Sequence, residues 1–406
     1  MVSKSVDAGI GTKRKIMKIT DVEIIVVDIP QPGVMDESPA KPDSSLSRSS
    51  IRDQSGAPGI SEIPQVNPPQ IVVLVVKTDS ELEGYGFGWG TKGGMRTAHT
   101  IAEVFRPELI GNDPLDRERL WHAAHRADRY GGLASFNSYG PLDVALWDIA
   151  SKSANLPLYK LIGAYRDRIP AYASSPFMQT PEEYASLAIE AKLEGFTAFK
   201  LHPPGEPDLD IACCEAVRTA VGPGFVLMSD PVGGNYGHED AVRVGRALER
   251  LEYLWLEEPL YDHDMHGLEQ LSRTLDIAIC AGEWNSDFFS KINYLKSGAA
   301  DIIRADVSWT GGITGTLKSA HIAEGFGVNC EIHMTVLSLM DVANLHVALA
   351  IKNCRYLELP YPDGATFGIK NPLKIDNEGY VRAPSEPGLG VNIDWDIIDK
   401  NSVVRI

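Results

Sequence analysis

The amino-acid sequence predicts an α/β protein, a modified (β/α) barrel of the TIM type that carries an N-terminal α+β capping domain. The first observation is a series of short apolar runs between residues 199 and 358, each of which ends in a charged or imidazole side chain. The second is their spacing, because intervals of 27, 26, 23 and 27 residues separate Asp230, Glu257, Glu283, Asp306 and His333. Such a period suits one strand, one helix and two loops, and apolar runs are typical of buried parallel strands. The third is that strand-like segments precede helix-like segments in the N-terminal part, as in an α+β domain.

The N-terminal part contains the elements of the predicted cap. Residues 1–16 are polar and contain glycine, so we expect a disordered tail. Residues 17–30 predict a strand, and residues 68–90 predict a hairpin, since two β-rich runs flank a polar turn. Residues 31–67 are dense in Pro, Ser, Gly and Asp without periodicity, and we interpret them as a mobile lid rather than a disordered insertion. Residues 95–163 place apolar side chains three and four apart, which predicts helices.

From residue 169 the predicted strands and helices alternate and come close to completing an eight-stranded barrel. The predicted strands are 169–174, 196–201, 225–229, 253–256, 277–281, 301–305, 328–332 and 355–359. The predicted helices are 181–194, 208–220, 238–250, 264–274, 287–297, 313–325 and 338–350. We therefore expect a capping domain at 17–140, a barrel at 141–360 and a C-terminal segment at 361–406. That segment has too little core to stand alone and is expected to pack back on the cap.

Composition and charge limit the class of protein. A chain of 406 residues suits two domains. Its net charge of −17 disfavours nucleic acid or an anionic membrane as a partner, but a local site can still attract an anionic small molecule. Five cysteines without metal-type spacing indicate reduced core residues. With no apolar leader and no run of membrane-spanning length, the sequence predicts a cytoplasmic protein.

Three carboxylates follow three consecutive predicted strands and indicate a metal site. Asp230, Glu257 and Glu283 would meet at the barrel mouth, where three anions repel one another unless a cation lies among them. Oxygen ligands suit Mg²⁺, with Mn²⁺ as the alternative. The competing interpretation is that each carboxylate is separately paired or solvated. Strand alternation points only one of Glu257 and Glu258 inward, so Glu258 is expected to have a structural partner or to start a helix.

Two further groups of strand-end residues are candidates for proton transfer. Lys200 and His202 lie two residues apart and therefore face the same side of a strand. For Lys200 we expect either a lowered pKa or binding of an anionic group. His202 is either a candidate general base or a loop histidine with satisfied hydrogen bonds. His333 ends a strand next to the one that ends in Asp306, so the carboxylate can orient the imidazole. Glu358 ends the last strand and is either a partner for a developing oxyanion or part of a salt bridge.

The ordered phrases of the sequence resemble the enolase superfamily, in particular its mandelate racemase subgroup, over residues 17–385. The resemblance rests on "ALWDIASKSANLPLYKLIG", "FKLH", "SDP", "WLEEP", "AGE", "ADVSWTGGITG" and "EIH". It implies a capping domain with a lid on a modified barrel. It also implies Mg²⁺ ligands at Asp230, Glu257 and Glu283, a His333–Asp306 dyad, and Glu358 bonded to the substrate carboxylate or enolate. The family reaction removes a proton α to a carboxylate and stabilises the enediolate on Mg²⁺.

Two positions depart from the family pattern. The family commonly has Lys-x-Lys on the second barrel strand with the second lysine as base, whereas this chain has Lys200 followed by His202. Many members carry Asn two residues after the first metal ligand, and Val232 occupies that place here. Both departures bear on the substrate more than on the reaction class.

The predicted activity is dehydration of a sugar acid to a 2-keto-3-deoxy acid by a lyase. Racemisation, epimerisation or cycloisomerisation of a hydroxy or sugar acid is the alternative, and a non-catalytic ligand-binding barrel is the alternative from another class. Tyr139, Ser174 and Trp309 are further candidates near the mouth, with core packing as the competing role for each. Selectivity is expected to reside in residues 31–67. The resemblance implies a homo-oligomer that acts on a small carboxylate.

Overall fold

A computed structural model describes residues 16–30, 69–90, 94–129, 135–233, 236–334 and 337–406. The predicted lid at 31–67 and the predicted N-terminal tail, apart from Ile16, lie outside the described residues. Within the described part, no helix is long and apolar enough to cross a membrane.

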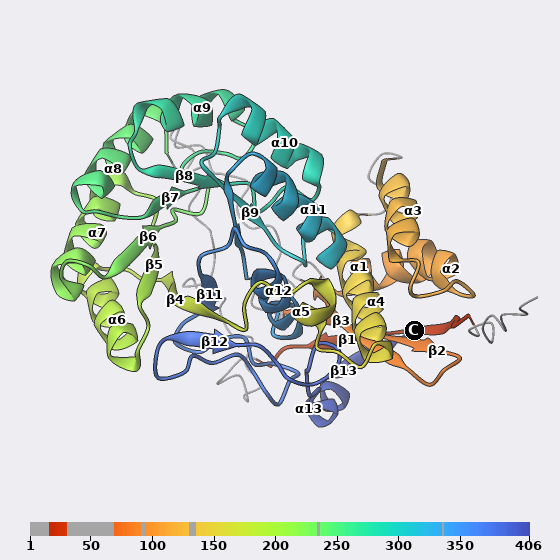
Figure 1. The fold of residues 1–406 in the computed structure, drawn as a ribbon. Coiled ribbons are helices and arrows are strands. Elements are labelled where there is room, and N and C mark those ends of the chain that lie inside the picture. Colours follow the sequence, from red (N-terminus) through yellow and green to blue (C-terminus); the bar gives the residue numbers. More distant parts are fainter. Residues whose placement is uncertain (1–15, 31–68, 91–93, 130–134, 234–235, 335–336) are drawn as a thin grey trace, which may run out of the picture.

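Eight parallel strands form a nearly closed barrel, which confirms the predicted fold class (Figure 1). Along the sheet, β10 is followed by β9, β8, β7, β6, β5, β4 and β11, and the described residues show no backbone ladder between β10 and β11. The strands are β4 (Arg168–Phe177), β5 (Ala198–His202), β6 (Val226–Ser229), β7 (Trp255–Glu257), β8 (Ala278–Ala281), β9 (Ile302–Ala305), β10 (Asn329–Ile332) and β11 (Leu357–Pro360).

Helices on the outside of the barrel connect these strands and begin close to their predicted positions (Figure 1). They are α6 (Pro181–Glu194), α7 (Pro207–Val221), α8 (His238–Arg250), α9 (Met265–Thr274), α10 (Phe288–Ser297), α11 (Gly312–Gly325) and α12 (Leu339–Ala350). Helix α6 shows why such boundaries can be predicted. The Thr180 hydroxyl accepts the Glu183 N–H, and the Glu183 carboxylate accepts the Thr180 N–H, so a capping box satisfies two backbone donors. Gly195, at φ 107°, ends the helix.

The cap consists of an antiparallel sheet with helices on one side (Figure 1). Strand β1 (Ile19–Asp28) pairs with β2 (Gln70–Thr78), which forms the predicted hairpin with β3 (Glu83–Gly90). The predicted helical region contains α1 (Gly94–Thr100), a π-helical turn η1 (Ile101–Phe105), α2 (Arg106–Leu109), α3 (Arg117–Arg129), a 3₁₀ turn η2 (Phe136–Ser138), α4 (Gly140–Ser153) and α5 (Leu158–Ile162).

Helix α4 connects the cap with the barrel because it packs closely against both. A Cβ atom at Gly84 would lie 2.0 Å from the Ala145 carbonyl oxygen, so only glycine lets β3 approach the helix backbone this closely. On the barrel side, the Asp143 carboxylate accepts the Thr314 N–H at 2.8 Å at the start of α11. The boundary at residue 140 stays a prediction, since α4 contacts both units.

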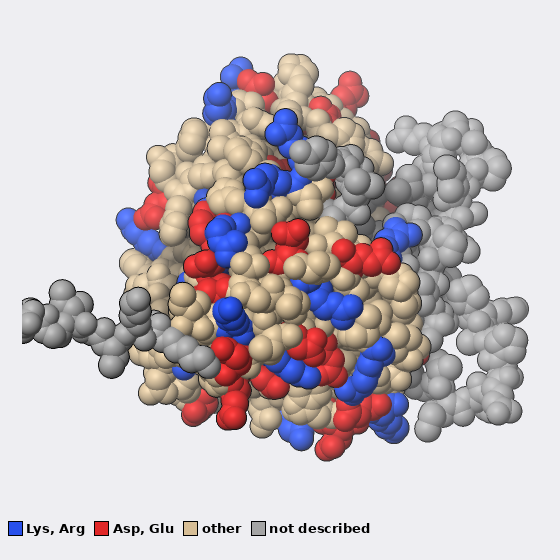
Figure 2. Space-filling view, turned by 90° about the vertical axis from the view of Figure 1, so that its right-hand side faces the viewer, with Lys and Arg blue, Asp and Glu red and all other residues tan. Residues whose placement is uncertain are grey.

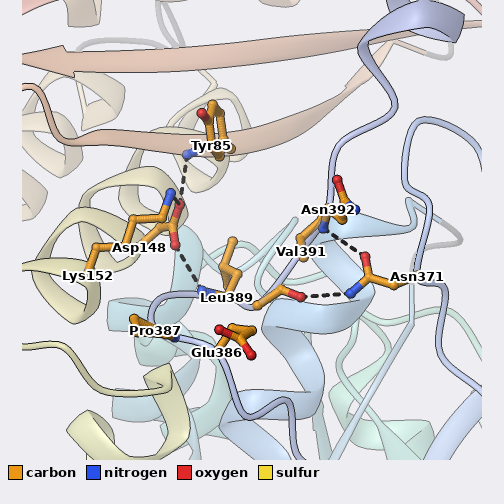
Figure 3. A pocket seen from close by; sticks show the side chains of 10 residues that line it. Tyr85, Asp148, Lys152, Asn371, Glu386, Pro387, Leu389, Val391 and Asn392 are labelled. Atoms are coloured by element: carbon orange, nitrogen blue, oxygen red, sulfur yellow. Dashed lines mark hydrogen bonds and ion pairs between the residues drawn. The ribbon is translucent and has the colours of Figure 1, made fainter.

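The C-terminal segment contacts the barrel and the cap. Strand β12 (Tyr380–Arg382) pairs with β4, and after α13 (Trp395–Lys400) strand β13 (Ser402–Arg405) pairs with β1. A cavity of about 320 Å³ lies between β3, α4 and this segment (Figure 3). On its wall Asp148 accepts the N–H groups of Leu389 at 2.9 Å and Tyr85 at 3.3 Å and pairs with Lys152 at 2.8 Å. These groups satisfy one another, so they fasten the segment to the cap.

The cysteines lie where the composition predicted them, in the protein core. All five cysteines are free and buried, as predicted for reduced core residues. On the face shown in Figure 2, acidic and basic side chains are interspersed and the described residues form no continuous basic area.

A buried histidine in α12 predicts a pH dependence of stability. The His346 side chain is fully buried; its Nδ1 accepts the Tyr159 N–H at 3.0 Å and its Nε2–H donates to the Leu389 carbonyl at 3.0 Å. Burial lowers the pKa of His346 from 6.5 to about 4. The unfolded chain binds the proton more readily, so this contribution to stability is complete above pH 6.5 and decreases as the pH falls toward 4.

We expect His346 to account for up to ~3 kcal/mol of the decrease in unfolding free energy over that interval. Urea titrations at several pH values should show a smaller decrease for His346→Gln than for the parent chain. His321→Gln, at an exposed histidine, serves as the control and should keep the parent's pH dependence. Equal pH dependence in both variants would contradict the assignment.

Candidate active site

The barrel gathers all the predicted site residues at the carboxyl ends of its strands. They are Lys200 and His202 on β5, Asp230 after β6, Glu257 at the end of β7, Glu283 after β8, Asp306 after β9, His333 after β10 and Glu358 on β11. Apart from the two histidines, each is at most 4% exposed. Parallel strands of a barrel end at one face, and this face is where such folds place their chemistry.

Lys200 links three carboxylates in the interior. Its Nζ lies 3.0 Å from Glu358 Oε1, 3.1 Å from Asp230 Oδ2 and 3.2 Å from Glu257 Oε2. Burial lowers the pKa of Lys200, but Glu257 and Glu358 outweigh it and raise the pKa well above its ordinary value. The expectation of a lowered pKa is therefore wrong, because the surrounding anions keep the side chain an ammonium ion.

Arg304 is a second buried cation that sequence reasoning missed. Its Nη2 lies 2.6 Å from Glu358 Oε2, its Nε lies 2.8 Å from Glu257 Oε1, and the side chain is fully buried. Glu283 Oε2 is 3.5 Å from the same Nε. Alternation along β9 could have identified it, since Arg304 lies two residues before Asp306 and so points to the same side.

Glu358 is held as an anion by these cations. Its Oε1 accepts the Ser174 hydroxyl at 2.7 Å, and its Oε2 pairs with Arg304. Burial raises the pKa of Glu358, but Lys200 and Arg304 outweigh it and hold the pKa well below the ordinary value. An ionised carboxylate has no proton to donate to an oxyanion, so this geometry favours the predicted salt bridge.

His202 lies at the edge of the cluster with one tautomer defined by the backbone. Its Nδ1 is 2.6 Å from the Ser175 carbonyl oxygen, which only accepts, so Nδ1 carries a proton. Its Nε2 lies 3.2 Å from Asp230 Oδ2. The imidazole is therefore oriented by the backbone, with Nε2 toward the carboxylates.

His333 pairs with Asp306 on the other side of the barrel. Nδ1 lies 2.8 Å from Asp306 Oδ2, and Nε2 lies 3.7 Å from Glu283 Oε1. Burial lowers the pKa of His333, but Glu283 and the hydrogen bond to Asp306 outweigh it and raise the pKa to about 9. The structure thus brings together the two residues of the expected dyad, with Nε2 directed toward the carboxylates.

The excess of buried negative charge suits a hard divalent cation. Burial and then the neighbours Glu257 and Asp230 raise the pKa of Glu283 to about 7, although His333 opposes them. At Asp230, burial raises the pKa, but Lys200 and His202 outweigh it and hold the pKa below the ordinary value. Among the described residues, no three His, Cys, Asp or Glu side chains are already arranged so that they could hold a metal ion. Oxygen donors that repel one another still fit Mg²⁺, which would relieve the repulsion.

Glu258 corrects one expectation about this cluster. It does not start a helix, since α9 begins at Met265. It has the expected structural partner, because its side chain hydrogen-bonds with Asp262, although its Oε1 atom has no hydrogen-bond partner within the described part of the chain. Its φ of 42° breaks the strand alternation on which its outward placement was based. Burial and then Glu283 raise the pKa of Glu258 well above its ordinary value, so it is a further carboxyl group beside the three predicted metal ligands.

The remaining candidates divide between packing and the site. Tyr139 is a core residue of the cap that stacks with Phe136 at a ring distance of 6.0 Å. Trp309 stacks on His333 at 4.6 Å and therefore belongs to the site. At Val232 the backbone N–H donates to Asp230 Oδ1 at 2.8 Å, so this position supports the carboxylate through its main chain.

Comparisons with known proteins agree with this arrangement. A family model described as enolase C-terminal domain-like matches residues 183–397, and one described as the mandelate racemase / muconate lactonizing enzyme N-terminal domain matches residues 55–163. The chain is 31% identical over 286 residues to an L-talarate/galactarate dehydratase of Salmonella typhimurium; these residues cover 69% of this chain and 70% of that protein. It is 29% identical to an arabinonate dehydratase of Saccharolobus solfataricus, over 84% of this chain and 92% of the relative.

A solved structure and two further relatives extend the comparison. The crystal structure of D-glucarate dehydratase from Agrobacterium tumefaciens complexed with magnesium superposes with a TM-score of 0.79 at 33% identity, covering 96% of this chain and 100% of that one. An N-succinyl-L-Arg/Lys racemase of Bacillus cereus is 27% identical over 82% of this chain and 90% of its own. A 3,6-anhydro-alpha-L-galactonate cycloisomerase of Streptomyces coelicolor is 28% identical over 82% of this chain and 92% of its own.

Proposed function

This chain belongs to the enolase superfamily, in its mandelate racemase subgroup, and from that premise we propose that it dehydrates a sugar acid to a 2-keto-3-deoxy acid. The observation that supports the proposal is a pair of oriented imidazoles on opposite parts of the barrel. His202 is the last residue of the second barrel strand, His333 follows the seventh, and each directs Nε2 toward the buried carboxylates. Two such groups supply the base and the acid that an elimination requires.

In the proposed reaction His202 Nε2 takes the proton from the α-carbon. The electron pair left behind forms a C–C double bond as the β-carbon–oxygen bond breaks, and His333 Nε2 gives its proton to the departing hydroxyl, which leaves as water. The enol then becomes the 2-keto acid. Asp306 holds the His333 ring in position through Nδ1, and Lys200 stays charged beside Glu358.

Asp230, Glu257 and Glu283 would hold the Mg²⁺ ion that this chemistry needs. When bound, the metal would supply positive charge that stabilises the additional negative charge on the substrate's carboxylate group after removal of the α-proton. The relatives support this choice, because the D-glucarate dehydratase structure was determined with magnesium. Mn²⁺ has the same preference for oxygen ligands and is the second candidate.

The experiment is a screen of acid sugars in D₂O that follows both 2-keto acid formation and exchange of the α-proton. Keto acid with incorporation of deuterium supports dehydration. Exchange without keto acid would instead support the racemase or epimerase alternative, which the Bacillus cereus relative makes the second candidate. If no acid in the panel exchanges its α-proton, the chain acts as a ligand-binding barrel.

Removal of divalent metal is expected to abolish turnover and to lower stability. At a free Mg²⁺ concentration of about 100 times the dissociation constant, binding should stabilise the fold by about 2.7 kcal/mol. Calorimetric melting after EDTA treatment, and again after addition of Mg²⁺ or Mn²⁺, measures this effect beside activity. Full activity in a sample shown to be free of metal would contradict the assignment.

A further inference from the structure

A buried lysine on α10 holds the turn that carries Glu283. The Lys291 side chain is fully buried, and its Nζ donates to the Gly282 carbonyl oxygen and, at 3.1 Å, to the Asn285 carbonyl oxygen. The Asn285 N–H donates to the same Gly282 oxygen at 3.3 Å and closes the turn. Glu283 therefore lies between two carbonyl groups that one ammonium group fastens together.

The backbone before Glu283 has the shape that this contact needs. Gly282 has a φ of 102°, a conformation that L side chains rarely adopt. A Cβ atom at this position would lie 3.7 Å from Lys291 Nζ, so the ammonium group lies directly against the residue that precedes Glu283. The direction in which the Glu283 side chain leaves the main chain therefore depends on a turn that Lys291 fixes from α10.

Packing alone does not account for a lysine at this position. A buried ammonium group is costly, and a methionine would fill a similar volume without that cost. The hydrogen bonds of Lys291 go to neutral carbonyl groups rather than to a carboxylate. Burial lowers the pKa of Lys291 to about 8, although acidic groups that include Asp287 and Glu258 oppose the shift, so the side chain is still mainly an ammonium ion at neutral pH.

The same turn also reaches the other half of the site. Trp284, next to Glu283, stacks on Trp309 with the ring centroids 4.3 Å apart, and Trp309 stacks on His333 at 4.6 Å. A displaced turn would therefore disturb a predicted metal ligand and, through Trp309, the surroundings of the proposed acid.

We propose that Lys291 is a positioning residue of the metal site, which fixes the Gly282–Asn285 turn so that the Glu283 carboxylate is held ready for a small divalent cation. The inference rests on the proposed function only for the assignment of Glu283 as a metal ligand. Mg²⁺ requires near-ideal octahedral geometry, whereas Ca²⁺ accepts flexible ligand arrangements. Loss of Lys291 should therefore weaken the binding of Mg²⁺ more than the binding of Ca²⁺.

The test measures metal binding to the full-length, EDTA-treated protein by titration calorimetry with Mg²⁺ and with Ca²⁺. Lys291→Met should weaken Mg²⁺ binding about 10- to 100-fold, the range for loss of groups that orient metal ligands. It should weaken Ca²⁺ binding by about threefold at most. Lys291→Gln keeps amide N–H donors without the charge and should lose less Mg²⁺ affinity than Lys291→Met.

The matched control is Lys296→Met, which removes an exposed lysine from the same helix and should change the affinity for neither ion. Unchanged or tighter Mg²⁺ binding in Lys291→Met would overturn the proposal, since a role through charge alone predicts tighter binding once a nearby cation is removed. Equal weakening of Mg²⁺ and Ca²⁺ binding would overturn it as well, because a general loosening of the fold affects both ions.

Two further outcomes are separable. If Lys291→Met does not fold, the ratio of Mg²⁺ to Ca²⁺ affinity in Lys291→Gln decides: a lower ratio supports the positioning role, and the parent's ratio overturns it. Failure of the proposed function gives a different result, in which Mg²⁺ binding depends on Lys291 as expected but no acid exchanges its α-proton.

Discussion

Replacing His333 with asparagine is expected to reduce turnover by about 10²–10⁴-fold, the range for loss of a general acid or base. An asparagine amide can still hydrogen-bond to Asp306, which accepts from His333 Nδ1 at 2.8 Å, but it cannot carry the proton at the position of Nε2. The local geometry should therefore survive while proton transfer is lost. Steady-state formation of keto acid measures the effect.

Mg²⁺ binding separates a catalytic from a structural role of His333. Titration calorimetry should give the His333→Asn variant the parent's Mg²⁺ affinity within about threefold, because Asp230, Glu257 and Glu283 are unchanged. His321→Asn, at an exposed position in α11, is the control and should keep full activity. Near-normal turnover of His333→Asn would defeat the dyad assignment, and loss of Mg²⁺ binding would show a structural role instead.

The regular part of the barrel could be predicted because each strand carries its own signal. An apolar run, a charged stop and a following amphipathic segment recur with one period, and the observed helix α6 has the predicted bounds of 181–194. The cap was less regular. The segment predicted as helix from residue 95 contains the π-helical turn η1, which depends on the backbone bonding pattern and not on apolar spacing.

The sequence predicted which side chains meet at the ends of the barrel strands. It did not predict features that depend on the backbone conformation or on the charges of neighbouring residues. Alternation failed at Glu258 because a positive φ follows β7, and no sequence pattern encodes that turn. The Ser175 carbonyl that orients His202 is a main-chain atom and is invisible to motif reasoning. The lowered pKa expected for Lys200, as one of two alternatives, was wrong because the expectation placed the lysine near a metal and did not include the carboxylates of Glu257 and Glu358.

Arg304 is a buried cation between two carboxylates of the site. Of the replacements considered, we expect its loss to have the largest effect on stability. Arg304→Gln removes a fully buried cation from Glu257 and Glu358, which lie 2.8 Å and 2.6 Å from it. Removing one partner of a buried ion pair costs about 3–5 kcal/mol, because the remaining charge is left without compensation. Urea unfolding should show this loss, and Arg304→Lys should show a smaller one because it keeps the charge without the paired geometry.

The control for Arg304→Gln is Arg273→Gln, which breaks an exposed pair with Glu269 on α9 and should change stability very little. The two variants remove the same group, so their difference isolates burial. Saturating Mg²⁺ should recover part of the loss in Arg304→Gln, because a divalent cation among the carboxylates replaces some of the missing positive charge. If Arg304→Gln lowers the free energy of unfolding no more than Arg273→Gln does, the ion pairs of Arg304 with the carboxylates do not stabilise the fold. If Mg²⁺ recovers stability but not turnover, Arg304 acts by positioning Glu257 and Glu358 and not by balancing charge alone.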